Sequence, residues 1–172
     1  MYHDTVTNDP NDPARTDVNV YLHKLTYANG GWTAGPRIQV NAPYATEHES
    51  DQFMPSVTVD DNGRIHIIFY DDRNYTDDPN DPENDQQPDD TYLPKFDVFY
   101  AWSDDQAQNW TNEELWFDPP EPALDFTRKI VDPREYIGIC WYDDLVWTAY
   151  TGTYSADPYN KGVIWSSRIE WP

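Results

Sequence analysis

The sequence has few basic side chains and no long apolar run. Only 11 Lys and Arg stand against 32 Asp and Glu, which gives a formal net charge of −21. A surface this acidic repels nucleic-acid phosphates and anionic lipid headgroups, so no nucleic-acid partner is expected. Because no apolar run approaches the length that crosses a bilayer, no membrane insertion is expected either.

Cysteine is almost absent. Cys140 stands alone and cannot form an internal disulfide, so cysteine usage leaves the cellular compartment open. It lies in the apolar, β-like run 136–142, where a small buried hydrophobic residue is expected rather than a nucleophile.

Helical signals are missing as well. The chain has 8 Trp, 13 Tyr and 15 Pro, few Ala or Leu, and no stretch with convincing helical periodicity. Flat aromatic rings pack well on pleated, half-buried surfaces, so the composition predicts an all-β fold.

The sequence repeats itself. Residues 9–13 read Asp-Pro-Asn-Asp-Pro, and residues 78–82 read the same. A β-type segment follows each copy, at 17–23 and at 97–103. Self-similarity on this scale predicts a repeat architecture, in which each unit buries its apolar face against a neighbour.

Alternating patterns and turn residues divide the chain into short antiparallel meanders. One hairpin pairs 55–60 with 64–70 through Asp61-Asn62-Gly63, and another pairs 135–141 with 145–151 through Asp143-Asp144. The other predicted strands are 18–25, 32–40 (after a turn at Gly30-Gly31), 96–102, 109–117 and 163–169.

These strands fit a partial β-propeller of four-stranded antiparallel blades. Residues 1–41 supply the end of one blade, with its third and fourth strands. Residues 53–118 form a complete blade, and residues 134–172 supply the first three strands of the last one.

One turn carries a motif. Residues 103–110 read Ser-Asp-Asp-Gln-Ala-Gln-Asn-Trp, which resembles the Asp-box, S-x-D-x-G-x-x-W, of sialidase-like (BNR-repeat) propellers. Ser103, Asp105 and Trp110 match it, while Ala107 replaces the glycine. The Asp can accept hydrogen bonds from the turn amides, and the Trp can plug the hairpin. Residues 51–73 and 135–150 also resemble hairpins of this family.

The resemblance implies a location outside the cytoplasm: secreted, periplasmic or at the cell surface. It also implies more blades than this chain supplies, because a propeller needs about four to eight. We therefore expect a C-terminal fragment, with the missing blades in the same full-length chain. The alternative is a homo-oligomer that completes the ring.

A sialidase binds the sugar carboxylate with three arginines and uses a Tyr–Glu nucleophile pair with an aspartate as acid and base. The arginine motifs are not recognisable here. The candidates for catalysis are Arg73, Arg134, Glu135 and Tyr136, and Asp71-Asp72-Arg73 is a candidate binding cluster. In the alternative interpretation, Tyr136 is an ordinary strand residue and Arg73 forms a salt bridge between blades.

The acidic, proline-rich loop 77–90 is a candidate Ca²⁺ site, with Asp77, Asp78 and Asp81 as ligands. It lacks the glycine and terminal glutamate of an EF-hand, and the alternative is a solvated insertion stiffened by proline. The four histidines lack metal-ligand spacing, and no other cofactor is expected.

Three functions follow from the resemblance. The first is a structural or glycan-binding module without an assignable active site, with Trp116, Trp165 and Trp171 as candidates for stacking on sugars. The second is the C-terminal part of an exo-α-sialidase or a related glycoside hydrolase. The third is a propeller that docks protein partners.

Overall fold

The computed structural model describes residues 2–6, 17–41, 51–73, 95–115, 130–131, 137–153 and 162–169. Every regular element in these ranges is a β-strand, and all strand pairs are antiparallel. The all-β prediction is therefore confirmed. No helix in the described ranges has the length and apolar character to cross a membrane.

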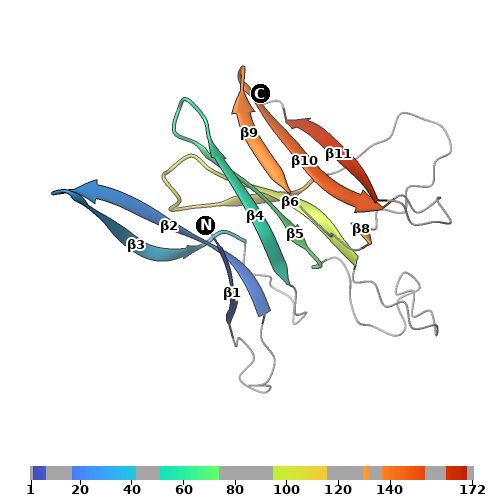
Figure 1. Ribbon diagram of the computed structural model, residues 1–172, viewed down its shortest axis with the longest axis horizontal. Helices are drawn as coiled ribbons and strands as arrows, with labels where there is room; N and C mark the ends of the chain where they lie inside the picture. Colours follow the sequence, from blue (N-terminus) through green and yellow to red (C-terminus); the bar gives the residue numbers. More distant parts are fainter. Residues whose placement is uncertain are drawn as a thin grey trace.

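The strands form three sheets, each a meander (Figure 1). The first contains β1 (Tyr2–Val6), β2 (Asp17–Ala28) and β3 (Gly31–Gln39). The central sheet contains β4 (Gln52–Val59), β5 (Ile65–Asp71), β6 (Lys95–Ser103), β7 (Thr111–Glu114) and the short β8 (Ile130–Val131), which pairs with β6. The third contains β9 (Gly138–Tyr142), β10 (Leu145–Thr153) and β11 (Gly162–Ile169).

The central sheet lies between the other two (Figure 1). Its first strand, β4, contacts β1 and β2 on one side and β9 on the other. Such contacts join segments that are far apart in the sequence, so the three meanders pack as one body rather than as separate hairpins.

Strand β5 explains why the sheets stack. Successive side chains of a strand point to opposite faces. Ile67 and Phe69 therefore face one side, in an apolar cluster with Val20 of the first sheet. Ile68 and Tyr70 face the other side, in a cluster with Val146 and Tyr150 of the third sheet. Because both faces are covered, β5 is buried along almost its whole length, as its apolar run predicts.

Turn chemistry fixes the hairpins. Asp143 and Asp144 have φ angles of 53° and 59°, so the second predicted hairpin turns where the sequence indicates. The first sheet turns at Asn29-Gly30, with φ angles of 52° and 81°, one residue earlier than the predicted Gly30-Gly31. Positive φ at both central residues is what a tight type I′ hairpin requires, and Asn-Gly satisfies it better than Gly-Gly, because Asn is less flexible when unfolded.

The prediction that Cys140 is buried is wrong, because the side chain is exposed. On β9 it alternates with Ile139 and Trp141, which pack against the cluster between the central and third sheets. The apolar run is therefore one-sided at this point, and Cys140 lies on its outer face.

Candidate functional site

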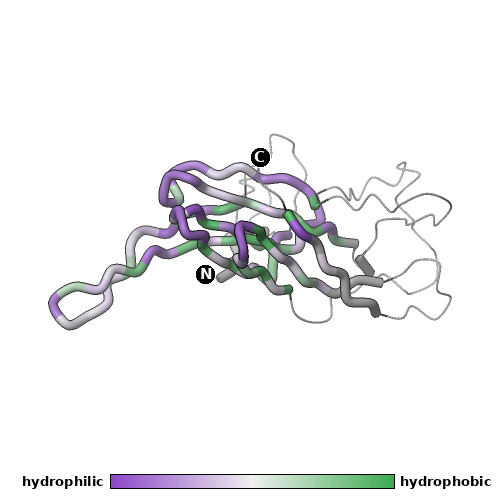
Figure 2. The backbone as a smooth tube through the Cα atoms, turned by 90° about the horizontal axis from the view of Figure 1, so that it is seen from above, coloured by the Kyte–Doolittle hydropathy of each residue, from purple (hydrophilic) through white to green (hydrophobic). Residues whose placement is uncertain are grey.

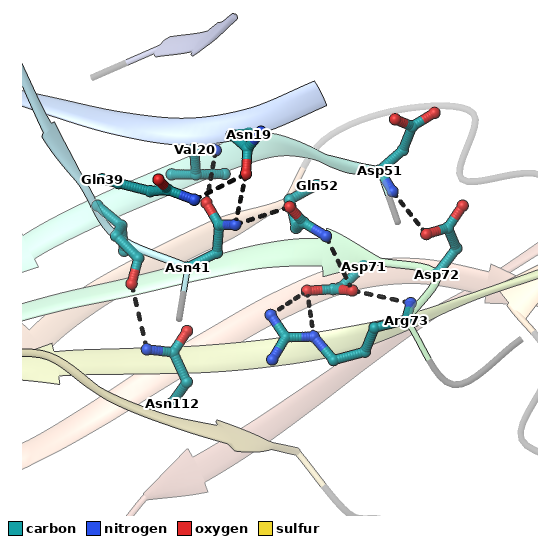
Figure 3. Close-up of polar contacts among 11 residues, drawn as sticks. Asn19, Val20, Gln39, Asn41, Asp51, Gln52, Asp71, Asp72, Arg73 and Asn112 are labelled. Carbon is teal, nitrogen blue, oxygen red and sulfur yellow. Dashed lines mark hydrogen bonds and ion pairs between the residues drawn. The ribbon is translucent and has the colours of Figure 1, made fainter. Parts of the chain in front are cut away.

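Polar residues gather where the first and central sheets end side by side (Figure 3). Because β4 and β5 are antiparallel, the start of β4 at Gln52 pairs with the end of β5 at Asp71. Asn19 near the start of β2 and Asn41 just after β3 approach the same place. Four segments that are distant in the sequence thus meet at one edge.

Asn41 connects the two sheets. Its Nδ2 donates to Asn19 Oδ1 and to Gln52 Oε1, both at 2.8 Å, and its Oδ1 accepts from the backbone N–H of Val20 at 3.0 Å. Asn19, Asn41 and Gln52 are all buried. This relay of hydrogen bonds holds the strand ends in a fixed relation, although Asn19 Nδ2 is buried without a partner among the described residues.

The relay continues into a buried ion pair. Gln52 Nε2 donates to Asp71 Oδ1 at 3.3 Å, and Arg73 donates to the same carboxylate from its backbone N–H at 2.9 Å and from Nε at 2.6 Å. The guanidinium carbon of Arg73 lies 4.1 Å from the centre of the Phe99 ring. Burial raises the pKa of Asp71, although Arg73 acts in the opposite direction.

Arg73 is enclosed at the end of the central sheet. Its side chain is only 4% exposed, and its carboxylate partner is two residues away on the same strand end. A guanidinium that is buried, paired and stacked is not presented to a ligand carboxylate. This ion pair lies within the end of the central sheet, and the interpretation of Arg73 as a salt bridge between blades stays a prediction.

Asp72 differs from its neighbours because it is only half-buried. Its Oδ1 accepts a hydrogen bond from the backbone N–H of Asp51 at 2.6 Å, and its own N–H donates to the Asp51 carbonyl at 3.3 Å. Asp51 is held in turn, since its Oδ1 accepts from the N–H of Val18 at 2.8 Å. Asp51 and Asp72 are thus hydrogen-bonded neighbours at the edge of the central sheet.

The environment of Asp72 favours its protonated form. Burial raises its pKa from 3.8 to about 7, and the negative charges of Asp51 and Asp71 act in the same direction, while the hydrogen bond from Asp51 opposes them. A carboxyl group that titrates near neutral pH can accept or donate a proton, which is the property that acid–base chemistry requires.

A second polar cluster lies between the central and third sheets. His66 is fully buried, its Nδ1 is 2.6 Å from the Tyr100 hydroxyl, and its Nε2 is 3.6 Å from Asp60. Its ring stacks on Trp141 of β9, with centroids 5.9 Å apart. Burial lowers the pKa of His66 and outweighs the opposing effect of Asp60. A neutral, enclosed histidine at this position joins two sheets.

The residues that resemble an Asp-box form a closed turn after β6. Ser103 Oγ donates to Asp105 Oδ1 at 2.9 Å and accepts from the N–H of Ala107 at 2.9 Å. Asp105 also accepts from the backbone N–H of Asn109 at 2.9 Å, and this contact with the side-chain bond from Asn109 lowers its pKa to about 2. Trp110 packs against the cluster between the first and central sheets. Ala107 has a φ of 73°, the conformation for which the motif uses glycine.

Several predicted residues lie outside the described ranges. These are Arg134, Glu135 and Tyr136, the calcium candidates Asp77, Asp78 and Asp81, and the tryptophans Trp116 and Trp171; of Trp165 only the backbone is described. In the described part of the chain, no three His, Cys, Asp or Glu side chains are grouped closely enough to hold a metal ion.

Sequence analysis singled out Asp71, Asp72 and Arg73, which the structure places together. Their partners Asn41 and Asp51 were not predicted, because Asn41 belongs to no motif and Asp51 stood out only as the first residue of the hairpin-like segment 51–73. The available signal was position: Asn41 directly follows the predicted strand 32–40, Asp51 lies in the loop before the predicted strand 55–60, and the ends of antiparallel neighbours meet at one edge.

No family model and no curated protein sequence matches this chain. Among solved structures it is similar to Zg3597, a family 117 glycoside hydrolase produced by the marine bacterium Zobellia galactanivorans, with a TM-score of 0.44 and 12% sequence identity. The alignment covers 88% of this chain and 41% of Zg3597, so the chain spans less than half the length of that protein. A similarity with so low a TM-score says nothing about the activity of this chain.

Proposed function

We propose that this chain is part of a sialidase-like β-propeller that acts outside the cytoplasm and binds carbohydrate beside Asp51 and Asp72. The packing of three antiparallel meanders supports the propeller. Strands β4 and β9 begin their sheets and contact each other, as the inner strands of neighbouring blades do. The hydrogen-bonded turn at Ser103 and Asp105 adds support.

The observation that carries the binding site is the half-buried Asp72 on a rigid polar frame. Carboxyl oxygens accept hydrogen bonds from sugar hydroxyls, and a protonated carboxyl also donates one. The relay through Asn41 and Gln52 fixes the strand ends before any ligand arrives. Binding groups that are ordered in advance lose less entropy on complex formation, which favours affinity.

The site suits a neutral sugar better than a sialoside. Arg73 is committed to Asp71 and buried, so it does not supply a cation for a sugar carboxylate. A ligand that shares the sign of Asp51 and of the whole chain would also be repelled. The sialidase alternative therefore depends on arginines elsewhere in the complete ring.

A glycan array followed by calorimetric titration tests this function. Asp51→Asn and Asp72→Asn are expected to weaken binding of a neutral oligosaccharide about tenfold or more, because the first removes a charged acceptor and the second replaces a carboxyl that can both accept and donate. Asp61→Asn is the matched control, since Asp61 is an exposed acid in the β4–β5 turn and lies away from the strand ends that form the site. Full affinity in both site variants, or no glycan binding by the wild type, would refute the proposal.

A second candidate, a glycoside hydrolase, is favoured by one observation: the pKa of Asp72 is near 7. In such enzymes one carboxylic acid protonates the leaving oxygen while a second carboxylate acts as base or nucleophile. Fluorogenic glycosides, a sialoside among them, test this with the full-length protein. The expected activity falls as pH rises above about 7 and is lost in Asp72→Asn.

The rest of the ring is part of the proposal. Propellers contain about four or more blades, so further sheets complete this one, supplied by the same full-length chain or by other copies. Docking of a different protein on the ring is the remaining alternative. Calcium binding by Asp77, Asp78 and Asp81 stays a prediction, and calorimetric titration with Ca²⁺ tests it.

A further inference from the structure

The β2–β3 hairpin extends well beyond the body of the protein (Figures 1 and 2). We call residues 24–36 the arm. Every side chain from Lys24 to Ala34 is exposed. The tight turn at Asn29-Gly30 and the antiparallel pairing of Ala28 with Gly31 make the arm an ordered projection.

One face of the arm is apolar. Leu25, Tyr27 and Trp32 are 57%, 59% and 70% exposed. Tyr27 lies opposite Trp32 in the strand register, so their side chains share a face, and their rings are in contact with centroids 5.1 Å apart. Large exposed apolar groups gathered on one sheet face indicate a surface that another molecule covers.

The arm and the strand segments at its base carry no acidic residue, unlike the rest of the chain. Residues 18–46 contain Lys24 and Arg37 and no Asp or Glu, so all 32 acidic residues lie elsewhere. Lys24 Nζ is exposed and donates to Gln106 Oε1, an uncharged partner, at 2.8 Å. That hydrogen bond holds Lys24 on the face toward the central sheet. Arg37, at the base of the arm, pairs with His23 in the register and lies over the Tyr21 ring, so it shares the face of Tyr27 and Trp32. This face, aromatic along the arm and cationic at its base, complements a surface that is apolar and acidic.

The third sheet offers such a surface on its outer face. Tyr142 is 71% exposed and Trp147 is 41% exposed, and their positions in the β9–β10 register place them on the same face, away from the core. The exposed Asp143 and Asp144 form the turn beside them. Arg168 of β11, opposite Trp147, also belongs to this face.

We propose that copies of this chain associate head to tail, with the arm of one copy on the outer face of the third sheet of the next. The two surfaces lie on opposite sides of the molecule, with the central sheet between them (Figure 1). The arm of one chain therefore cannot reach the third sheet of the same chain. In the contact, Tyr27 and Trp32 cover Tyr142 and Trp147, and Arg37 at the base of the arm lies on the side that faces the acidic turn.

Such an interface joins two different surfaces, so repetition gives a closed ring or an open chain of copies. The proposal uses none of the residues of the carbohydrate site, so either can fail alone.

Sedimentation velocity of the 172-residue chain, up to about 100 µM, tests the association. Trp32→Ser and Tyr142→Ser each remove one side of the contact at positions of matched exposure, and each is expected to weaken association about tenfold or more. Val59→Ser is the control, because Val59 is a 54% exposed apolar residue on β4. Circular dichroism verifies that the variants remain folded.

Mixing supplies the sharper test. Trp32→Ser keeps an intact outer face, and Tyr142→Ser keeps an intact arm. At a concentration where the wild type associates and a tenfold weaker contact does not form, each variant alone is expected to be monomeric, and an equimolar mixture is expected to form a dimer that grows no further. A monomeric wild type, a mixture that stays monomeric, or equal disruption by Val59→Ser would overturn the proposal. Arm fluorescence that responds to a saccharide while the wild type stays monomeric would assign the arm to sugar instead.

Discussion

Replacement of Asp72 by Asn is predicted to stabilise the protein at alkaline pH. Asn has nearly the same shape as Asp and can still accept the hydrogen bond from the Asp51 N–H. It carries no charge, so it removes the penalty of ionising a carboxyl that is half-buried beside Asp51 and Asp71.

The magnitude follows from the pKa. A rise from 3.8 to about 7 makes ionisation of Asp72 harder in the folded chain than in the unfolded chain by about 4 kcal/mol. Solvent screening at the exposed part of the carboxyl reduces this to about 2 kcal/mol. Because the folded-state pKa is raised, the stabilisation from the bound proton is complete below about pH 4 and disappears as the pH rises through about 7.

Urea denaturation followed by tryptophan fluorescence, at intervals from pH 4 to pH 8.5, measures the difference between wild type and Asp72→Asn. The variant is expected to be more stable by about 2 kcal/mol at pH 8, with a gap that closes toward pH 4. All other titrating groups, His66 included, are common to both proteins and cancel in the difference. A gap independent of pH, or a variant that is less stable at pH 8, would refute the assigned environment of Asp72.

Three further predictions concern stability. Arg73→Met is expected to destabilise the fold by about 3–5 kcal/mol, because Asp71 would be buried without its partner, and urea denaturation should show most of this loss restored in the double variant Asp71→Leu, Arg73→Met. Ala107→Gly is expected to stabilise the protein by up to about 1 kcal/mol, because glycine removes the steric strain of a Cβ at a φ of 73° and this gain exceeds the added flexibility of the unfolded chain. A lower thermal midpoint for the variant would contradict this prediction. The pKa of His66 is lowered in the folded chain, so the stability that His66 contributes is present above about pH 6.5 and is lost as the pH falls below it. The difference in free energy of unfolding between wild type and His66→Gln should therefore shrink in acid. A difference in urea midpoint between wild type and His66→Gln that is the same at pH 8 and at pH 5 would contradict the lowered pKa of His66.

The strands were predictable because local patterns determine them. Each strand expected from alternation and turn residues overlaps a strand of the structure, and the two-residue β8 is too short to have a pattern of its own. The error at Cys140 has the same origin, since alternation identifies two faces of β9 but not which one meets a neighbouring sheet. That choice depends on packing between segments that are distant in the sequence.

The candidate site was predictable only in part. Asp71, Asp72 and Arg73 stood out as a charged cluster after a strand, but their separate roles follow from unequal burial. The role of Asn41 depends on the folded structure, in which the end of the first sheet lies beside β4. Polar residues at strand ends are common, and the neighbour that each meets is a property of the assembled sheets.

The structure of the full-length protein, determined by crystallography or electron microscopy with a bound neutral oligosaccharide, tests the central claim most directly. The prediction is a ring of sheets around a common axis, with β4 and β9 innermost and a sugar hydroxyl within hydrogen-bonding distance of Asp72. Two sheets packed as a sandwich without a common axis, or a sugar bound away from Asp51 and Asp72, would contradict it.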